Sequence, residues 1–189
     1  MFSNLEFIKK FHLNKLALQA INFKKNKMRF IWLSLIVIFS ACTQTDDMAL
    51  YKTNLEVAQK AMSCFETPQD FETYKSLIHQ DVQHQSPVYG KGIVGYEDVM
   101  NQAKFYMEGF SDVTFANAVW LPGVDTASLQ NNGSVRVYGT WQGKSNENGK
   151  SFAVDSYHYF DVTDGKITAS GDYFDASGMV MAVSESSEE

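Results

Sequence analysis

The sequence has little cysteine and proline, with two cysteines and three prolines among 189 residues. Beyond Cys42 only Cys64 remains, so the chain after Cys42 has no cysteine pair for an internal disulfide. We expect Cys64 to pack inside the domain as a small apolar group. Long hydrophobic runs are also missing. The apolar stretch from Phe30 to Phe39 is shorter than the roughly 20 residues that a membrane-spanning helix requires.

Basic residues are concentrated at the N-terminus. Residues 1–30 carry seven of the sixteen lysines and arginines and a single acid, Glu6. A basic segment, a short apolar run and then small residues are typical of a secretory signal. We therefore predict that residues 1–41 are a signal segment, with the translated start at either Met1 or Met28.

The predicted signal ends in Phe39-Ser40-Ala41-Cys42, which resembles a bacterial lipobox, although Phe39 stands where Leu, Ile or Val is usual. The resemblance implies that Cys42 is lipidated and anchors the chain in the cell envelope, at the outer membrane or the cell surface. Asp46-Asp47 is similar to the surface-export signal of Bacteroidetes-type lipoproteins. The alternative to a lipobox is an ordinary secretory signal. The alternative to a surface-export signal is a solvated tether over residues 42–50.

Removal of residues 1–41 leaves an acidic chain. That segment holds seven of the sixteen basic residues and one of the 22 acidic ones, which leaves 9 basic and 21 acidic residues and a net charge near −12. Nucleic acids and anionic membrane surfaces would be repelled, so we expect neither as a partner. The remaining length fits one domain with a sizeable core.

Helical patterns come first in this domain and strand patterns follow. A capping box at Thr53–Glu56, the Thr67-Pro68-Gln69-Asp70 start and an apolar stripe over about 95–110 predict three helices. Extended segments are expected at 81–87, 113–121, 135–142, 151–162, 166–174 and 179–183. Residues 184–189 read as a disordered acidic tail. This order predicts an α+β fold over residues 51–183, with about three helices on a curved antiparallel sheet that forms a cone with a pocket at its open end.

The last hairpin carries the clearest turn signal. Asp164-Gly165 is typical of a type I′ turn, because both central residues need a positive φ. Thr163 would then pair with Lys166, and in a regular ladder Tyr157 would face Asp172. Side chains alternate across a strand, so His158 would point to the opposite face. The chemistry-bearing face would hold Asp155, Tyr157, Tyr159, Ser170 and Asp172.

Four short motifs carry a family resemblance: His84-Gln85-Ser86-Pro87, Gly92–Tyr96, Asp164-Gly165-Lys166-Ile167 and Asp172-Tyr173-Phe174-Asp175. In this order and spacing they resemble the SnoaL-like branch of the nuclear transport factor 2-like superfamily. Such domains include cyclases, isomerases, dehydratases, epoxide hydrolases and members without known activity. The last motif is also similar to that of limonene epoxide hydrolases, but Arg136 comes too early in its strand and no Asp follows it, so we disfavour that activity.

Asp172 is the candidate acid or base, because burial in an apolar cavity raises the pKa of a carboxyl group. The resemblance implies that the segment with His84 borders the cavity mouth, where a histidine would carry protons. We predict catalytic roles for Asp172 and His84, and ligand contacts from Tyr157, Tyr159, Asp155, Ser170 and Phe174. The alternative is that Asp172 only forms hydrogen bonds with the phenols, as a buried polar group requires. A slip of one residue in the hairpin register would place these side chains on opposite faces.

No cofactor or metal is predicted. The glycines do not form a dinucleotide- or phosphate-binding loop after a strand, and no nucleophile elbow is present. His84, His158, Asp155 and Asp172 lack the spacing of metal ligands. The sequence therefore predicts a lipid-anchored domain that binds a small apolar or amphipathic molecule. Two functions stay open: proton-transfer chemistry, and a non-catalytic binding or interaction module with a filled cone. A homodimer through the outer sheet face is also expected from the resemblance.

Overall fold

The computed structural model describes residues 48–184. The predicted signal segment, the lipidation site Cys42, tether residues 42–47 and tail residues 185–189 lie outside the described residues. The described chain has an α+β fold, which confirms the predicted class. Its elements are α2 (Ala49–Ser63), α3 (Phe71–Leu77), β1 (Ile78–Gln85), β2 (Ile93–Val94), α4 (Tyr96–Gly109), β3 (Phe110–Val124), β4 (Asn131–Ser145), β5 (Ser151–Thr163), β6 (Lys166–Tyr173) and α5 (Ala176–Ser184).

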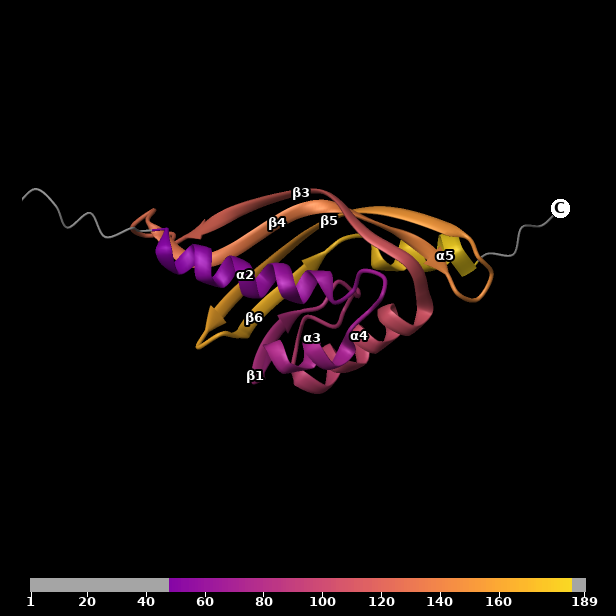
Figure 1. Cartoon of the computed structure of the whole chain (residues 1–189), viewed down its shortest axis with the longest axis horizontal. Helices are drawn as coiled ribbons and strands as arrows, with labels where there is room; N and C mark the ends of the chain where they lie inside the picture. The colour runs from indigo at the N-terminus through magenta and orange to yellow at the C-terminus, as the bar shows by residue number, and fades with distance from the viewer. Residues whose placement is uncertain (1–47, 185–189) are drawn as a thin grey trace, which may run out of the picture. The chain divides into compact units, whose positions relative to one another are not determined.

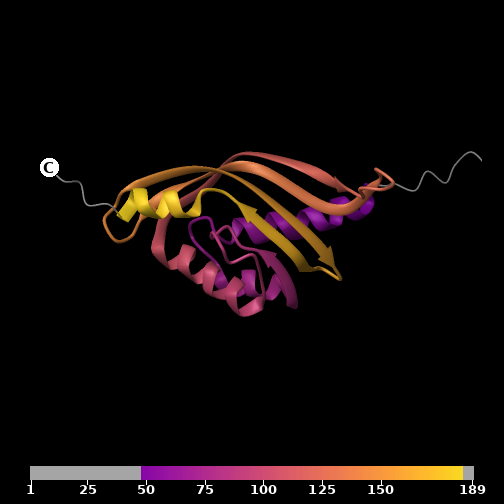
Figure 2. The same ribbon diagram turned by 180° about the vertical axis from the view of Figure 1, so that it is seen from behind.

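The strands form one curved sheet in the order β2-β1-β6-β5-β4-β3. Neighbouring strands are antiparallel except β1 and β6, which pair parallel. The prediction of an antiparallel sheet therefore holds for four of the five strand pairs. Figures 1 and 2 show the sheet arching over α2, α3 and α4, which lie on its concave side. The parallel pairing places His84 beside Ser170, and this brings β1 to the C-terminal hairpin.

The first helix begins earlier than the predicted capping box. Helix α2 starts at Ala49, and Thr53 lies inside it, where its hydroxyl donates to the Ala49 carbonyl oxygen at 3.2 Å. The prediction of a helix start at Thr53 is therefore wrong. The apolar stripe of this helix extends back to the buried Tyr51, and burial of that ring against the sheet outweighs the local capping preference.

The other two predicted helices form with small changes at their ends. Helix α3 starts at Phe71 rather than at Pro68, because the side chain of Asp70 caps it by accepting from the Thr73 N–H at 2.9 Å. Helix α4 runs from Tyr96 to Gly109 and confirms the third prediction.

The main core lies between α2, α4 and the concave face of the sheet. Val135 and Val137 of β4 are fully buried there, and burial of each valine stabilises the fold by roughly 1.5–3 kcal/mol. Ala58 and Ala61 of α2 belong to the same cluster, and their small side chains allow the helix to lie close to the strands. Phe160 of β5 and Ile167 of β6 belong to the same cluster, so the core holds α2 against β4, β5 and β6.

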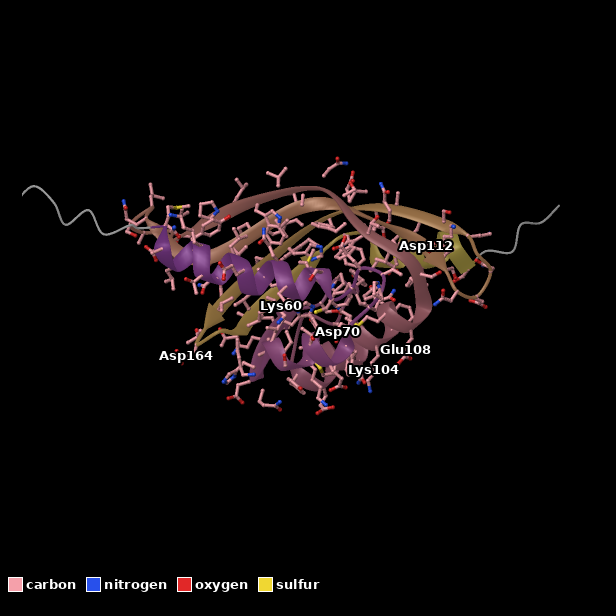
Figure 3. The ribbon with its side chains drawn as sticks, in the orientation of Figure 1. Lys60, Asp70, Lys104, Glu108, Asp112 and Asp164 are labelled. Atoms are coloured by element: carbon pink, nitrogen blue, oxygen red, sulfur yellow. The ribbon has the colours of Figure 1, made fainter. Side chains whose placement is uncertain are left out.

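The last hairpin confirms the predicted turn but not the predicted ladder. Asp164 and Gly165 have φ of 51° and 73°, and Thr163 pairs with Lys166. Figure 3 labels Asp164 at the hairpin tip. Val162 then pairs with Ile167 but Asp161 pairs with Ala169, so Thr168 is an extra residue in β6. The Thr168 hydroxyl donates to the Asp161 carbonyl oxygen at 3.2 Å within this bulge.

This bulge reverses the predicted faces. Asp172 pairs with His158, and Tyr157 pairs with Tyr173 instead of Asp172. A slip of one residue moves every later side chain to the other face of its partner strand. His158 consequently lies on the concave face with Ser170 and Asp172, and the tyrosines of β5 lie on the outer face.

Residues 179–183 form a helix, not the predicted extension of the sheet. Helix α5 begins after Asp175, whose side chain accepts from the Gly178 N–H at 2.8 Å as an N-terminal cap. Met179 and Val183 pack on Phe110 and Val113 in a second buried cluster. Figure 1 shows α5 at the end of the sheet away from the β5–β6 turn. None of the helices in residues 48–184 is long and apolar enough to cross a membrane.

Candidate functional site

A cavity of about 80 Å³ lies between the concave face of the sheet and helices α2, α3, α4 and α5. A single water needs only ~10–15 Å³ of such space, so the cavity has room for a small organic molecule. Its lining is mostly apolar and rich in rings, which come from Phe65, Tyr74, Tyr106, Phe110, Trp141, Phe152, Phe160 and Phe174.

Asp172 is the carboxylate in this lining. It stands on β6, and 18% of its side chain is exposed. Its Oδ1 lies 2.7 Å from Nδ1 of His158, and its Oδ2 accepts from the Gln102 amide nitrogen at 2.8 Å. Nε2 of His84 lies 3.5 Å from the same Oδ2. Three elements, β5, α4 and β1, therefore converge on one carboxyl group.

The two histidines are almost completely buried, at 3% exposure each. Nε2 of His158 accepts from the Trp141 indole N–H at 3.0 Å and lies 3.0 Å from the Ser156 hydroxyl. Nδ1 of His84 lies 2.9 Å from the Ser170 hydroxyl. Every ring nitrogen of the pair has a polar partner, so both rings are fixed in orientation.

The neighbours of Asp172 reverse the pKa direction expected from burial. Desolvation raises the pKa of the Asp172 carboxyl, but its polar neighbours, His158 first, then His84 and the Gln102 hydrogen bond, together lower it further than burial raises it. The net pKa lies below the ordinary value of an aspartate. The expectation of a raised pKa is therefore wrong, and Asp172 is a carboxylate at neutral pH.

The pKa values of two tyrosines in the lining shift in the opposite direction. Burial, followed by the nearby negative charge of Asp172, raises the pKa of the Tyr74 phenol and of the Tyr106 phenol. Both therefore keep their protons at any physiological pH and can donate hydrogen bonds to a ligand oxygen. The tyrosines in the cavity lining are thus Tyr74 and Tyr106, and not the predicted Tyr157 and Tyr159.

The predicted site residues divide between the two faces of the sheet. His84, Ser170, Asp172 and Phe174 line the cavity. Asp155, Tyr157 and Tyr159 lie on the outer face, because they alternate along β5 with the buried Ser156, His158 and Phe160. The Thr168 bulge in β6 places Asp172 on the other face from them. Asp155 accepts from the Thr140 hydroxyl at 2.7 Å, and the Arg136 guanidinium lies over the Tyr159 ring at 5.2 Å. His158, which was predicted to lie outside the cavity, is part of its lining.

Sequence reasoning missed Gln102, Trp141, Tyr74 and Tyr106. The tyrosines had a signal, because each lies on the apolar stripe of its predicted helix while carrying a polar hydroxyl. Gln102 had none, since a glutamine in an amphipathic helix usually faces water. Within residues 48–184 no group of three or more His, Cys, Asp or Glu side chains is arranged to hold a metal ion.

The fold and the cavity define a small α+β domain whose curved sheet and helices enclose an apolar cavity with a carboxylate in its lining. The chain belongs to the SnoaL-like polyketide cyclase family, whose model matches residues 56–182. Members of this family have a nuclear transport factor 2-like fold, and the match is consistent with a domain that binds small molecules. A search among curated proteins finds no match.

Solved structures with the same fold are similar over most of the domain. A candidate polyketide cyclase of Xanthomonas campestris pv. campestris has a TM-score of 0.57 at 16% identity, covering 72% of this chain and 100% of that one. A phenazine biosynthesis-related protein of Pseudomonas aeruginosa has a TM-score of 0.55 at 18% identity, covering 76% and 93%. A Catenulispora acidiphila protein with a ketosteroid isomerase-like fold, in complex with trimethylamine, has a TM-score of 0.52 at 14% identity, covering 71% and 96%. These likenesses establish the fold.

Proposed function

We propose that this chain is an exported, lipid-anchored protein that binds a small, partly apolar molecule in the cavity and transfers a proton to or from it at Asp172. The observation that carries the proposal is a carboxylate in a ring-lined cavity, with donors that fix both of its oxygens. A polar group placed in an otherwise apolar cavity orients a ligand. A cavity of about 80 Å³ favours ligand binding over a cone filled by its own side chains.

Proton transfer would begin at Asp172. As a carboxylate it accepts a proton from a C–H bond of the ligand that a neighbouring carbonyl has made acidic. Nε2 of His84, 3.5 Å from Oδ2, is placed to take that proton onward and to return it at another carbon. The phenols of Tyr74 and Tyr106 would donate hydrogen bonds to the oxygen on which negative charge develops. This is the chemistry of an isomerase, a cyclase or a dehydratase.

The test compares the full chain with its Asp172→Asn variant in hydrogen exchange. A panel of small ketones and enones is incubated in deuterated water, and incorporation of deuterium at carbon is followed by NMR. Loss of the base is expected to lower the exchange rate by about 10²–10⁴-fold. The matched control is Asp164→Asn, which removes one carboxylate at the hairpin tip and keeps a residue that suits its turn. Equal exchange in all three proteins would refute the catalytic role.

The second candidate is a non-catalytic binding module. The lowered pKa of Asp172 favours it, because a carboxylate held as an anion by its hydrogen-bond donors is a weak base. In that case Asp172 would only orient the bound molecule. Binding of a ligand without any carbon-bound exchange, weakened by Asp172→Asn, is the result that this alternative predicts.

The cellular location is proposed from the N-terminal sequence. The basic segment 1–30, the apolar run to Phe39 and the lipobox-like end at Cys42 support export and lipid anchoring in the cell envelope, at the outer membrane or the surface. Two or more acyl chains give stable anchoring. In the expressing bacterium, wild type is expected to incorporate labelled palmitate and to sediment with membranes. Cys42→Ser should do neither, and palmitate incorporation by that variant would reject the assignment.

A homodimer through the outer sheet face belongs to the same proposal. Tyr138 and Tyr173 are each 51% exposed there, and their rings flank Tyr157 at centroid distances of 4.8 and 5.7 Å. Val119 on β3 pairs with Tyr138, which extends the apolar surface across four strands. An exposed apolar surface of this extent is typical of an interface.

A further inference from the structure

The hydrogen positions around Asp172 follow from which atoms can only donate. An indole N–H is a donor without an acceptor lone pair, and Nε1 of Trp141 lies 3.0 Å from Nε2 of His158. Nε2 is therefore unprotonated, and the single ring proton sits on Nδ1, which faces Oδ1 of Asp172 at 2.7 Å. His158 thus gives Asp172 a hydrogen bond without a positive charge.

An amide fixes the second histidine in the same way. The nitrogen of Gln102 faces Oδ2 of Asp172 at 2.8 Å, and this orientation is the one a carboxylate requires, because an amide oxygen would repel it. The second hydrogen of that nitrogen is available to Nε2 of His84 at 3.3 Å. His84 therefore accepts at Nε2 and carries its proton on Nδ1, toward the Ser170 hydroxyl at 2.9 Å. His84 is neutral as well.

The negative charge of Asp172 consequently has no countercharge in the lining. Among the described residues that line the cavity there is no lysine or arginine. The ion-pair contacts of Asp172 are with the two neutral histidines. Tyr74 and Tyr106, which face the same space, remain uncharged phenols. Buried charges in proteins are normally paired, so a single carboxylate held by neutral donors calls for a positive partner.

The walls of the cavity suit such a partner. Phe65, Phe110, Trp141, Phe152, Phe160 and Phe174 surround the space with ring faces and edges. Ring faces attract ammonium groups, and the attraction grows when water is excluded. We propose that the ligand is a small organic cation, an ammonium group on a compact apolar body, with its charge beside Asp172 and its carbon atoms against the rings. This inference rests on the proposed ligand-binding function and names the chemical class of the ligand.

The experiment compares three small probes that share an isopropyl group and differ in charge. Isopropylammonium, propan-2-ol and isobutyrate are titrated into the full chain at pH 7, and dissociation constants are measured by ligand-observed NMR. Such small probes bind weakly at best, in the millimolar range. Isopropylammonium is expected to bind at least tenfold more tightly than propan-2-ol, and isobutyrate more weakly than both. Because this order of affinities is measured in the unaltered chain, it tests the charge of the ligand without relying on a variant.

Three variants locate the preference. Asp172→Asn should abolish the preference for the cation while propan-2-ol binds within about twofold of its former affinity, and Asp164→Asn should leave all three constants unchanged. Val154→Trp, which fills the cavity, should remove binding of every probe. If propan-2-ol or isobutyrate binds best and Val154→Trp abolishes that binding, the cavity is a ligand site and the cationic class is wrong. If no probe binding responds to Val154→Trp, the proposed binding function itself fails.

Discussion

His158 Nδ1 lies 2.7 Å from Asp172 Oδ1, and a regular hairpin would have kept these two residues on opposite faces of the sheet. The pair exists because Thr168 is an extra residue in β6, which turns Asp172 toward His158 instead of Tyr157. Trp141 on β4 and Gln102 on α4 then complete the network. One bulge near the turn therefore decides which side chains meet the ligand cavity.

The first prediction concerns the stability of this network. Asp172→Ala removes the acceptor for the His158 Nδ1–H and for the Gln102 amide, and both donors are left in a water-poor cavity. Each buried donor without a partner costs about 1–3 kcal/mol. We expect the free energy of unfolding, measured by urea titration at pH 7, to fall by at least that amount. The free energy of unfolding should fall less in Asp164→Ala, which changes the exposed hairpin tip. A larger loss in that variant would contradict the argument.

The second prediction is the pH dependence of that contribution. The pKa of Asp172 is lower in the folded chain than its ordinary value of about 4, so its ionised form is favoured by folding. The stabilisation is therefore complete above about pH 5, begins to decline near the unfolded pKa of about 4 and is lost as the pH falls through the folded pKa.

The measurement is the difference in unfolding free energy between wild type and Asp172→Asn, taken between pH 3 and pH 7. The difference should be constant above about pH 5 and should shrink below about pH 4. Asp164→Asn corrects for the loss of one negative charge from the whole molecule. A difference that grows as the solution becomes more acidic would mean that burial dominates and that the folded pKa is raised.

The third prediction tests the close packing of the outer face. A Cβ built on Gly171 of β6 would overlap the Tyr159 ring and would lie 2.9 Å from the Gln85 Cβ. Gly171→Ala should therefore displace Tyr159 and destabilise the fold by roughly 1–3 kcal/mol. Gly109→Ala is the matched control, because nothing lies within 4 Å of its Cβ position. Thermal unfolding should separate the two, and equal midpoints would contradict the packing argument.

How far the sequence predicted this domain depends on how local each signal is. The Asp164-Gly165 turn and the helix over 96–109 were predictable because their causes lie within a few residues. The Thr168 bulge was not, since one extra residue in a strand leaves no mark in the alternation of a short, polar sequence. The contacts of Trp141 and Gln102 with the His158–Asp172 pair join three elements and depend on that bulge. The motif Asp172–Asp175 thus contributed to the family resemblance, but the assumption of a regular ladder placed the wrong neighbours around Asp172.

The last prediction concerns the proposed dimer and uses the order of side chains on the outer face. In the β4–β5 ladder Arg136 pairs with Tyr159, Tyr138 with Tyr157, and Thr140 with Asp155. The tyrosine pair thus lies between a positive and a negative residue. A two-fold axis along the tyrosine row would stack the rows and bring Arg136 of one protomer close to the partner's Asp155.

Wild type is expected to be a dimer in sedimentation equilibrium or light scattering. Arg136→Glu places like charges together and should weaken dimerisation at least tenfold, because like-charge contacts in an interface cost several kcal/mol. Adding Asp155→Lys to Arg136→Glu reverses both charges and should restore the dimer. A merely disrupted surface would not recover in this way, so the double variant separates specific pairing from damage. A monomeric wild type, or a double variant no tighter than Arg136→Glu, would rule out this arrangement.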